Sequence, residues 1–406
     1  MTDVGRILTA QGLRAAAYGF GSVLLGASLD AQGFSAAQVG LLLTAIVAGT
    51  ALVSFLVGRY GDRCGRRRLY AGLFVGLSLS GVAFGLSHSL PLLILVALTG
   101  TLSTEVVESG PFTSLEQAML PAIVEGERRT RIFGTYNAIA TLAGSFGALA
   151  AGGPELLRKF GPNFPTDQRL FLLLVPVGLV GASLAWWLSD AAESGRSPNN
   201  TSPALGRSRD TVMRLSALFA LDSFAGGFVV QSFIAFWFAR RFSVSLEVLG
   251  LVFFAVGLLQ SVSFLLATRL AERIGLLNTM VFTHLPSNVL LAAIPLAPSL
   301  PVAIALLLGR FAMSQMDVPT RQAYVMALVD AEERTATAAY TNTARYLVRP
   351  IGPALAGVSQ QVALGLPFFL GGAIKVVYDL AIWSWFKRVP LASEEPCRRQ
   401  IPLTEA

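Results

Sequence analysis

The chain has 406 residues, of which 53% are hydrophobic and only 14% are charged, and its mean hydropathy is +0.61. A soluble globular protein would carry charge on about a quarter of its residues, so the composition excludes that class and predicts a helical protein that crosses a membrane many times. The formal net charge of +7 does not indicate nucleic-acid binding, because the basic residues gather in short segments between apolar runs.

Apolar runs long enough to cross about 30 Å of hydrocarbon recur along the whole chain. They predict an all-α membrane protein with twelve transmembrane helices. The predicted helices cover residues 8–30, 36–58, 68–88, 91–119, 129–152, 169–189, 213–239, 246–270, 277–297, 300–328, 334–358 and 364–387. The first apolar run lacks a small-residue cleavage site, so we expect it to be retained as a helix and not removed as a signal peptide.

The longest polar stretch, from Asp190 to Asp210, is rich in Ser, Pro, Asn and Arg and predicts a flexible linker between two six-helix bundles. The predicted units are an N-terminal bundle at 1–189, a cytoplasmic linker at 190–212, a C-terminal bundle at 213–388 and a short cytoplasmic tail at 389–406.

Arginines lie mainly on one side of the predicted helices, which indicates the cytoplasmic side. Both termini are therefore predicted to be cytoplasmic, in a multi-pass plasma-membrane protein. Arginine greatly outnumbers lysine, which favours a GC-rich bacterial genome and hence the bacterial inner membrane. We expect a monomer surrounded by lipid, with no nucleic-acid partner.

Cysteine and histidine are rare, with two of each in the chain. Cys64 and Cys397 both fall on the predicted cytoplasmic side, so we expect no disulfide framework. Residues so few and so far apart do not suggest a metal site, and we expect neither a metal nor another cofactor.

An internal repeat supports the two halves. Residues 129–152 align with 334–357 at a shift of 205, and Glu116 falls on Arg321 at the same shift. A short basic loop is repeated as well. The residues aligned in it are Asp62, Arg63 and Gly65 in the first copy and Glu272, Arg273 and Gly275 in the second.

The first copy of this loop, from Gly58 to Arg68, resembles the loop between helices 2 and 3 of the major facilitator superfamily of transporters, with proton-coupled efflux members most similar. The residues that carry the resemblance are Gly58, Asp62, Arg63, Gly65, Arg66 and Arg67. Residues 59–61 depart from the family pattern, which usually has small or apolar residues there. The resemblance implies two six-helix bundles, and it assigns Asp62 and its arginines to a contact that steadies one state of the transport cycle. A plain positively charged membrane anchor is the alternative.

Charged residues inside the predicted helices are functional candidates, because a charge there costs on the order of 2.5–3.5 kcal/mol. Glu105 and Glu108 stand at i,i+3 on one helix face. Two carboxylates so close in a low dielectric should not both be ionised, so one of them should hold a proton near neutral pH. A proton carrier requires such a group. The alternative is that each pairs with an arginine or a backbone donor. Asp222 and Asp317 are further candidates for proton coupling.

Arg345 and Arg349 stand at i,i+4 before Pro350, which should bend their helix. Two arginines on one face can hold a carboxylate or phosphate by forked hydrogen bonds, or they can neutralise acidic residues across a central cavity. The full set of substrate-cavity candidates is Arg321, Arg345, Arg349, Tyr136, Asn137, Gln231, Gln260 and Asn342.

Other intramembrane charges suggest structural roles. Asp317 and Arg321 stand at i,i+4 and permit a salt bridge within one helix, and Lys375 and Asp379 predict a second pair of that kind. Glu116 lies near the cytoplasmic end of its helix, where we expect a gate or surface residue.

Together these patterns predict a secondary active transporter that moves a small molecule by alternating access, coupled to protons. Export is favoured, because the family that the loop resembles is rich in exporters. Uptake or exchange of a small organic anion, clamped by Arg345 and Arg349, is the alternative, and a non-transporting membrane sensor with the same fold is an alternative of another class. The sequence has no Gly-x-x-x-x-Gly-Lys-Ser/Thr loop for a nucleotide, and we do not expect an enzyme.

Overall fold

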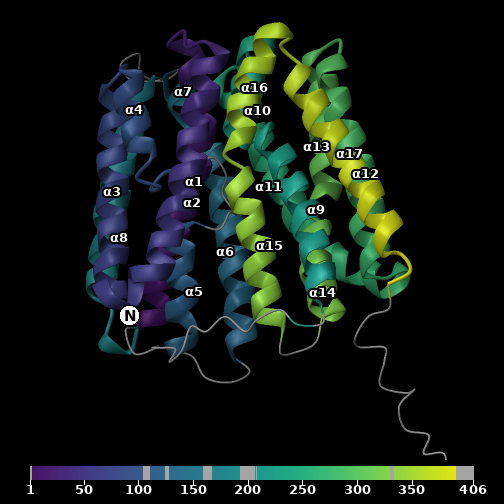
Figure 1. Ribbon diagram of the computed structural model, residues 1–406. Helices are drawn as coiled ribbons and strands as arrows, with labels where there is room; N and C mark the ends of the chain where they lie inside the picture. The colour runs from purple at the N-terminus through teal and green to yellow at the C-terminus, as the bar shows by residue number, and fades with distance from the viewer. Residues whose placement is uncertain are drawn as a thin grey trace, which may run out of the picture.

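The computed structural model describes residues 2–103, 110–123, 128–158, 167–192, 206, 208–329 and 333–389. Within these ranges the chain forms α-helices and short 3-10 helices, with no β-strand. The helices stand side by side along one common direction (Figure 1). The expected all-α class is therefore confirmed.

The helices of the first half, α1–α8, lie on one side of Figure 1, and those of the second half, α9–α17, lie on the other. The first half contains α1 (Asp3–Ala31), α2 (Ala36–Cys64), α3 (Arg66–Leu86), α4 (Leu90–Ala97), α5 (Pro111–Ile123), α6 (Arg128–Ala150), α7 (Gly153–Arg158), η1 (Gln168–Leu173), α8 (Leu174–Trp186) and η2 (Asp190–Ala192). The second half contains α9 (Arg209–Gly227), α10 (Gln231–Phe242), α11 (Leu246–Ile274), α12 (Leu276–Ala293), η3 (Ile294–Leu296), α13 (Leu300–Ser314), α14 (Asp317–Leu328), α15 (Arg334–Val348), α16 (Ile351–Val362) and α17 (Leu366–Phe386).

Eight helical stretches of the described chain are long and apolar enough to cross a membrane. They are Ala36–Gly61, Arg66–Leu86, Gln168–Trp186, Arg209–Phe242, Leu246–Ile274, Leu276–Leu296, Leu300–Val325 and Leu366–Phe386. Four predicted spans remain. One coincides with α1, one with α4 and α5 together, one with α6, and one with α15 and α16 together. Of these, α4 is short, and α1, α6 and α15 are rich in small or polar residues. The chain is thus a multi-pass helical membrane protein, and the division into twelve spans stays a prediction.

The arginine-rich segment between α2 and α3 is not the loop that the sequence predicts. α2 continues to Cys64 and α3 begins at Arg66, so Gly65 alone separates them, with a φ of 86°. Its counterpart in the repeat, Gly275, separates α11 from α12 with a φ of 85°. Only glycine adopts this backbone region without strain. The helix extends beyond the apolar run because its charged side chains are solvated at the membrane surface.

Several of the predicted helices are interrupted near their middle. α9 and α10 are separated by residues 228–230, and α13 and α14 by residues 315–316. Arg349 and Pro350 separate α15 from α16, so the helix is interrupted where the sequence predicts a bend at this proline. Such breaks are tolerated at membrane depth where they line a cavity or are buried in protein, and these breaks adjoin the cavity described below.

The two halves approach each other closely at the end of the bundle that lies away from residue 2. A Cβ atom built on Gly26 of α1 would lie 2.3 Å from the Ser232 carbonyl oxygen of α10. The same atom on Gly40 of α2 would lie 2.4 Å from the Pro353 oxygen of α16. α6 and α11 also pack together across the halves. We call this end the closed end; the N-terminus and the end of α17 lie at the opposite end (Figure 1).

Candidate functional site

A cavity of about 310 Å³ lies between the two halves. α6 contributes to its wall from the first half, and α9 to α15 and α17 contribute from the second. Charged and imidazole side chains make up about half of the polar residues in its wall. Those among the described residues are Asp222, His284, Arg310, Asp317, Arg321, Arg345, Arg349 and Lys375.

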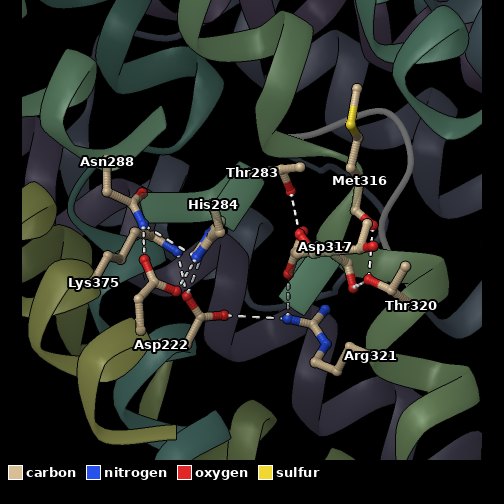
Figure 2. Close-up of polar contacts among 11 residues, drawn as sticks. Asp222, Thr283, His284, Asn288, Met316, Asp317, Thr320, Arg321 and Lys375 are labelled. Carbon is tan, nitrogen blue, oxygen red and sulfur yellow. Dashed lines mark hydrogen bonds and ion pairs between the residues drawn. The ribbon is translucent and has the colours of Figure 1, made fainter. Parts of the chain in front are cut away.

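Asp222 of α9 lies at the centre of this group and is only 4% exposed. The Lys375 ammonium of α17 donates to its Oδ1 atom at 2.5 Å, and the Arg321 guanidinium of α14 lies 3.4 Å from its Oδ2 atom. Figure 2 shows the carboxylate between these two cations. A buried carboxylate needs such partners, because burial of an unpaired charge is very costly.

Asp317 pairs with Arg321 on its own helix. The Nη1 atom of Arg321 donates to Asp317 Oδ2 at 2.9 Å, so the predicted i,i+4 salt bridge is confirmed. The same guanidinium therefore serves two carboxylates, one on α14 and one on α9 (Figure 2). This bridge ties the break between α13 and α14 to the wall that α9 forms.

His284 and Asn288 of α12 bind the acidic residue of α17, Asp379. The His284 Nδ1 atom lies 2.7 Å from Asp379 Oδ1, and Asn288 donates to Asp379 Oδ2 at 2.8 Å. The predicted pair of Lys375 with Asp379 is therefore wrong: Lys375 binds Asp222, and Asp379 binds α12. The i,i+4 spacing brings the two side chains to one face of α17, but α9 and α12 supply nearer partners.

The two arginines of the α15 end, Arg345 and Arg349, both line the cavity, as the sequence predicts for substrate candidates. The Nε atom of Arg345 is buried and has no hydrogen-bond partner within the described part of the chain. The Arg345 backbone oxygen accepts a hydrogen bond from Ser223 of α9, which fixes α15 against α9 beside Asp222.

The first half holds a separate buried charge pair. Arg14 of α1 donates to Glu116 of α5 at 2.8 Å, and Tyr136 and Tyr70 donate to the same carboxylate at 2.5 Å and 2.7 Å. Arg14 also donates to Gln11. Glu116 is fully buried, so its expected position at the surface is wrong, while a role as a gate stays a prediction. Its place near a helix end in the sequence gave no sign of the tyrosines that surround it.

Tyr136, a predicted cavity residue, belongs to this first-half cluster and is 3% exposed. It is absent from the cavity wall, as are Asn137 and Asn342, whose side chains are exposed. Gln231 and Gln260 do line the cavity, and Gln231 donates across the halves to Ser22 at 2.8 Å. Glu105 and Glu108, the first candidates for proton coupling, lie outside the described residues.

The residues of the arginine-rich segment contact their own half where the structure describes them. Arg66 donates to the Ala118 oxygen of α5 at 3.1 Å, and Arg67 donates to the Leu188 oxygen at 2.9 Å. The other residues of this candidate set are placed as follows: Gly58 and Arg63 are exposed on α2, Glu272 and Arg273 are exposed in the last turn of α11, and the Asp62 side chain lies outside the described part.

Comparison with known families agrees with this architecture. The sequence profile of the Major Facilitator Superfamily matches residues 7–353. The chain belongs to this superfamily. The uncharacterized membrane protein YJR124C of Saccharomyces cerevisiae is 25% identical over 410 residues and covers 92% of either chain. The uncharacterized MFS-type transporter YceJ of Bacillus subtilis is 22% identical over 324 residues, which are 79% of this chain and 80% of that protein.

Solved structures of other Major Facilitator Superfamily transporters share the fold. A bacterial homologue of the human lysosomal transporter Spinster, in an inward-facing and occupied conformation, has a TM-score of 0.73 and 16% identity over 95% of this chain and 96% of its own. The xylose transporter XylE from E. coli, in an inward-open conformation, has a TM-score of 0.69 and 15% identity over 97% and 98%. The superfamily member described here is therefore a secondary transporter, with a small-molecule substrate and a place in a membrane.

Sequence reasoning missed His284 and Asn288 in this transporter. Two histidines so far apart in the sequence argue against a metal site and by themselves suggest no other role. A usable signal was present, since His284 and Asn288 stand at i,i+4 inside an apolar run and an ionisable residue at membrane depth is a functional candidate. Their partner on α17 is far away in sequence, so only the fold could identify it.

Proposed function

We propose that this transporter carries a small organic anion in its central cavity. The observation that carries the proposal is the charge of the described cavity wall. Its cationic residues are Arg310, Arg321, Arg345, Arg349 and Lys375, and its carboxylates are Asp222 and Asp317. Both carboxylates already hold cations, because Lys375 and Arg321 bind them. An anionic substrate would balance the charge of Arg345, whose Nε atom is buried without a partner within the described chain, because such a charge is costly in a low dielectric.

Arg345 is the residue that we assign to the first contact with the substrate. Its Nε atom is buried without a hydrogen-bond partner in the described chain, although it belongs to a side chain of the cavity wall. A guanidinium binds a carboxylate, phosphate or sulfonate through two parallel hydrogen bonds. The cavity volume of about 310 Å³ is at the lower end of the range for ligand sites, which supports a small substrate.

Export of an amphipathic compound, the function that the loop resemblance favours, would require a broad apolar cavity. The ionisable wall around Asp222 and Arg345 supports an anion instead, and transport in either direction is compatible with it. Proton coupling is part of the proposal. Asp222 and Asp317 are its described candidates, beside Glu105 and Glu108.

We also propose the topology that the sequence predicts: twelve spans, two six-helix bundles, both termini in the cytoplasm of a bacterium, and a monomer. Under this topology the closed end is extracellular and the structure is inward-facing. The inward-facing and inward-open states of the Spinster homologue and XylE support this assignment.

The test is a thermal-shift screen of the purified protein with three compounds of one shape: benzenesulfonate as anion, benzenesulfonamide as neutral analogue and phenyltrimethylammonium as cation. Carboxylates and phosphate monoesters extend the anion arm. We expect stabilisation by anions alone, lost in Arg345→Gln and kept in Arg209→Gln, which removes an exposed arginine at the start of α9.

Flux of the best anion into proteoliposomes then separates a transporter from a sensor. Stabilisation by the cation or the neutral compound, or equal loss in both arginine variants, would refute the anion site. Binding without flux under any imposed gradient would favour the sensor.

A further inference from the structure

His284 has no part in anion binding as proposed above, yet it is a buried titratable residue on the cavity wall. It is 5% exposed and lies on α12, a helix that the sequence did not connect with function. Histidine is the side chain whose charge changes most readily between pH 5 and 8. Its surroundings decide what that change can do.

Two carboxylates flank the imidazole ring, one at each nitrogen. Nδ1 lies 2.7 Å from Asp379 Oδ1, and Nε2 lies 4.0 Å from Asp222 Oδ1. A neutral ring that donates its Nδ1 proton to Asp379 turns the lone pair of Nε2 towards a carboxylate oxygen. These two atoms repel until Nε2 takes up a proton, and then they attract.

The oxygen that faces Nε2 is already in use. Lys375 Nζ lies 2.5 Å from the same Asp222 Oδ1 atom, while Arg321 approaches the other oxygen, Oδ2. Figure 2 shows His284 and Lys375 side by side at this carboxylate. A protonated His284 therefore competes with Lys375 for one oxygen, and the two cations also repel each other.

We propose that His284, in place of the carboxylates considered above, is the proton-binding residue of this transporter and that its protonation releases Lys375 from Asp222 into the cavity. A hydronium ion in the cavity gives its proton to Nε2 and leaves as water. The imidazolium then bridges Asp379 and Asp222, Arg321 keeps its contact with Asp222, and the ammonium of Lys375 turns towards the substrate. This inference rests on the proposed anion site.

Other charged and titratable groups lie around the ring on neighbouring helices. Asp379 and Tyr378 of α17 and Asp222 of α9 lie next to it, and Lys375 of α17 and Asp317 of α14 interact with it electrostatically. Arg321 of α14 and Arg310 of α13 line the same cavity. α11 carries no charged residue between Glu247 and Arg269. The three carboxylates attract a proton to the ring, and the three cations oppose it.

Proton and anion then bind cooperatively, because each favours the state in which Lys375 is released. Reciprocity requires that the anion raises proton affinity by the same factor as the proton raises anion affinity. Where one proton binds with each anion, the affinity for the anion should rise about tenfold for each unit by which the pH falls.

The first experiment needs no substrate. The chain has two histidines and three lysines, Lys159, Lys375 and Lys387, so ¹⁵N labelling of these two residue types gives few side-chain signals. We expect His284 to become an imidazolium between pH 8 and 5 and the Lys375 signal to shift in the same step. In His284→Asn, which keeps a donor for Asp379, that lysine shift should vanish. His88→Gln assigns the second histidine and should leave the Lys375 shift intact.

A His284 signal that stays neutral over this range, or a Lys375 signal that moves equally in His284→Asn, would overturn the proposal. Because the first of these results comes from the unaltered protein, a variant that fails to fold does not obscure it. Neither result depends on an anion, so failure here is distinct from failure of the proposed function.

The second experiment measures the affinity for benzenesulfonate, a permanent anion, against pH. We expect it to rise on acidification in the wild type and to be nearly flat in His284→Asn and Lys375→Gln. Equal pH dependence in all three proteins would overturn the coupling while leaving the anion site standing. No binding at any pH would refute the anion site, and the labelled residues would still decide whether His284 switches Lys375.

Discussion

The two halves of the molecule hold a buried salt bridge at equivalent places, with the charges exchanged. In the first half Arg14 of α1 binds Glu116 of α5, and in the second half Asp222 of α9 binds Arg321 of α14. The internal repeat aligns Glu116 with Arg321 directly. Each bridge thus joins the first helix of a half to the helix that completes its fourth predicted span.

Glycine contacts support this equivalence independently. Gly147 and Gly352, which the repeat aligns, each press against the first helix of their own half. A Cβ atom on Gly147 would lie 2.0 Å from the Ala16 oxygen, and one on Gly352 would lie 2.7 Å from the Phe224 oxygen. Ala16 follows Arg14 by two positions, and Phe224 follows Asp222 by two positions.

The neighbours of the two bridges differ, and this difference separates structure from function. Around Arg14 and Glu116 the described partners are tyrosines and a glutamine, which carry no charge, and none of these residues lines the cavity. Around Asp222 lie Lys375 and His284, which do line it. The same bridge is thus a buried ion pair with uncharged neighbours in the first half, and part of a cluster of charged residues on the cavity wall in the second half.

The largest effect should come from breaking the closed pair. Glu116→Leu leaves the Arg14 charge buried without its carboxylate, which should cost about 3–5 kcal/mol in the free energy of unfolding. Arg14→Met together with Glu116→Leu removes both charges and should recover most of that loss. Unfolding in detergent micelles measures both proteins. Equal loss in the single and double variants would mean that packing, and not charge, holds α1 to α5.

Charge reversal compares the two bridges directly. The pair Arg14→Glu with Glu116→Arg should fold and transport, because its described neighbours are uncharged and accept either orientation. The pair Asp222→Arg with Arg321→Asp should abolish transport, because Lys375 and His284 would then face a cation. Flux in proteoliposomes decides between them. Transport by the protein with Asp222→Arg and Arg321→Asp would show that it does not matter which of these two positions carries the positive charge.

A smaller effect is expected at the paired glycines. Gly147→Ala and Gly352→Ala each push a methyl group against a backbone oxygen and should cost about 1–3 kcal/mol. Gly153→Ala is the matched control, because within the described chain no atom beyond its own helical turn lies within 4 Å of the position that its methyl group would take. Thermal unfolding of the three variants is the measurement. A cost at only one of the aligned glycines would weaken the equivalence of the two bridges.

The smallest effect should follow from Arg240→Gln, which removes a pair between the halves. Arg240 of α10 lies 3.4 Å from Asp30 of α1, and its side chain is half exposed. Exposed ion pairs contribute at most about 1 kcal/mol. We expect unfolding to change little and the closed end to open slightly more often. Faster labelling, from that side, of a cysteine introduced into the cavity wall by Gln260→Cys would detect this opening. A loss comparable to that of Glu116→Leu would contradict the distinction between buried and exposed pairs.

Much of the architecture followed from local sequence patterns. Long apolar runs identified the helical membrane class, and the segment from Gly58 to Arg68 indicated the superfamily. The Asp317–Arg321 pair and the helix break at Pro350 lie where the sequence places them. These features depend on residues close together in the chain, whose geometry helix periodicity already determines.

The composition of the charge clusters was decided by the tertiary structure alone. Lys375 has a nearby acid on its own helix, but it binds Asp222, and Asp379 binds His284 and Asn288 instead. Spacing along one helix determines which face a side chain occupies. It does not determine which other helix lies against that face, and at membrane depth a charge binds whichever partner that helix brings.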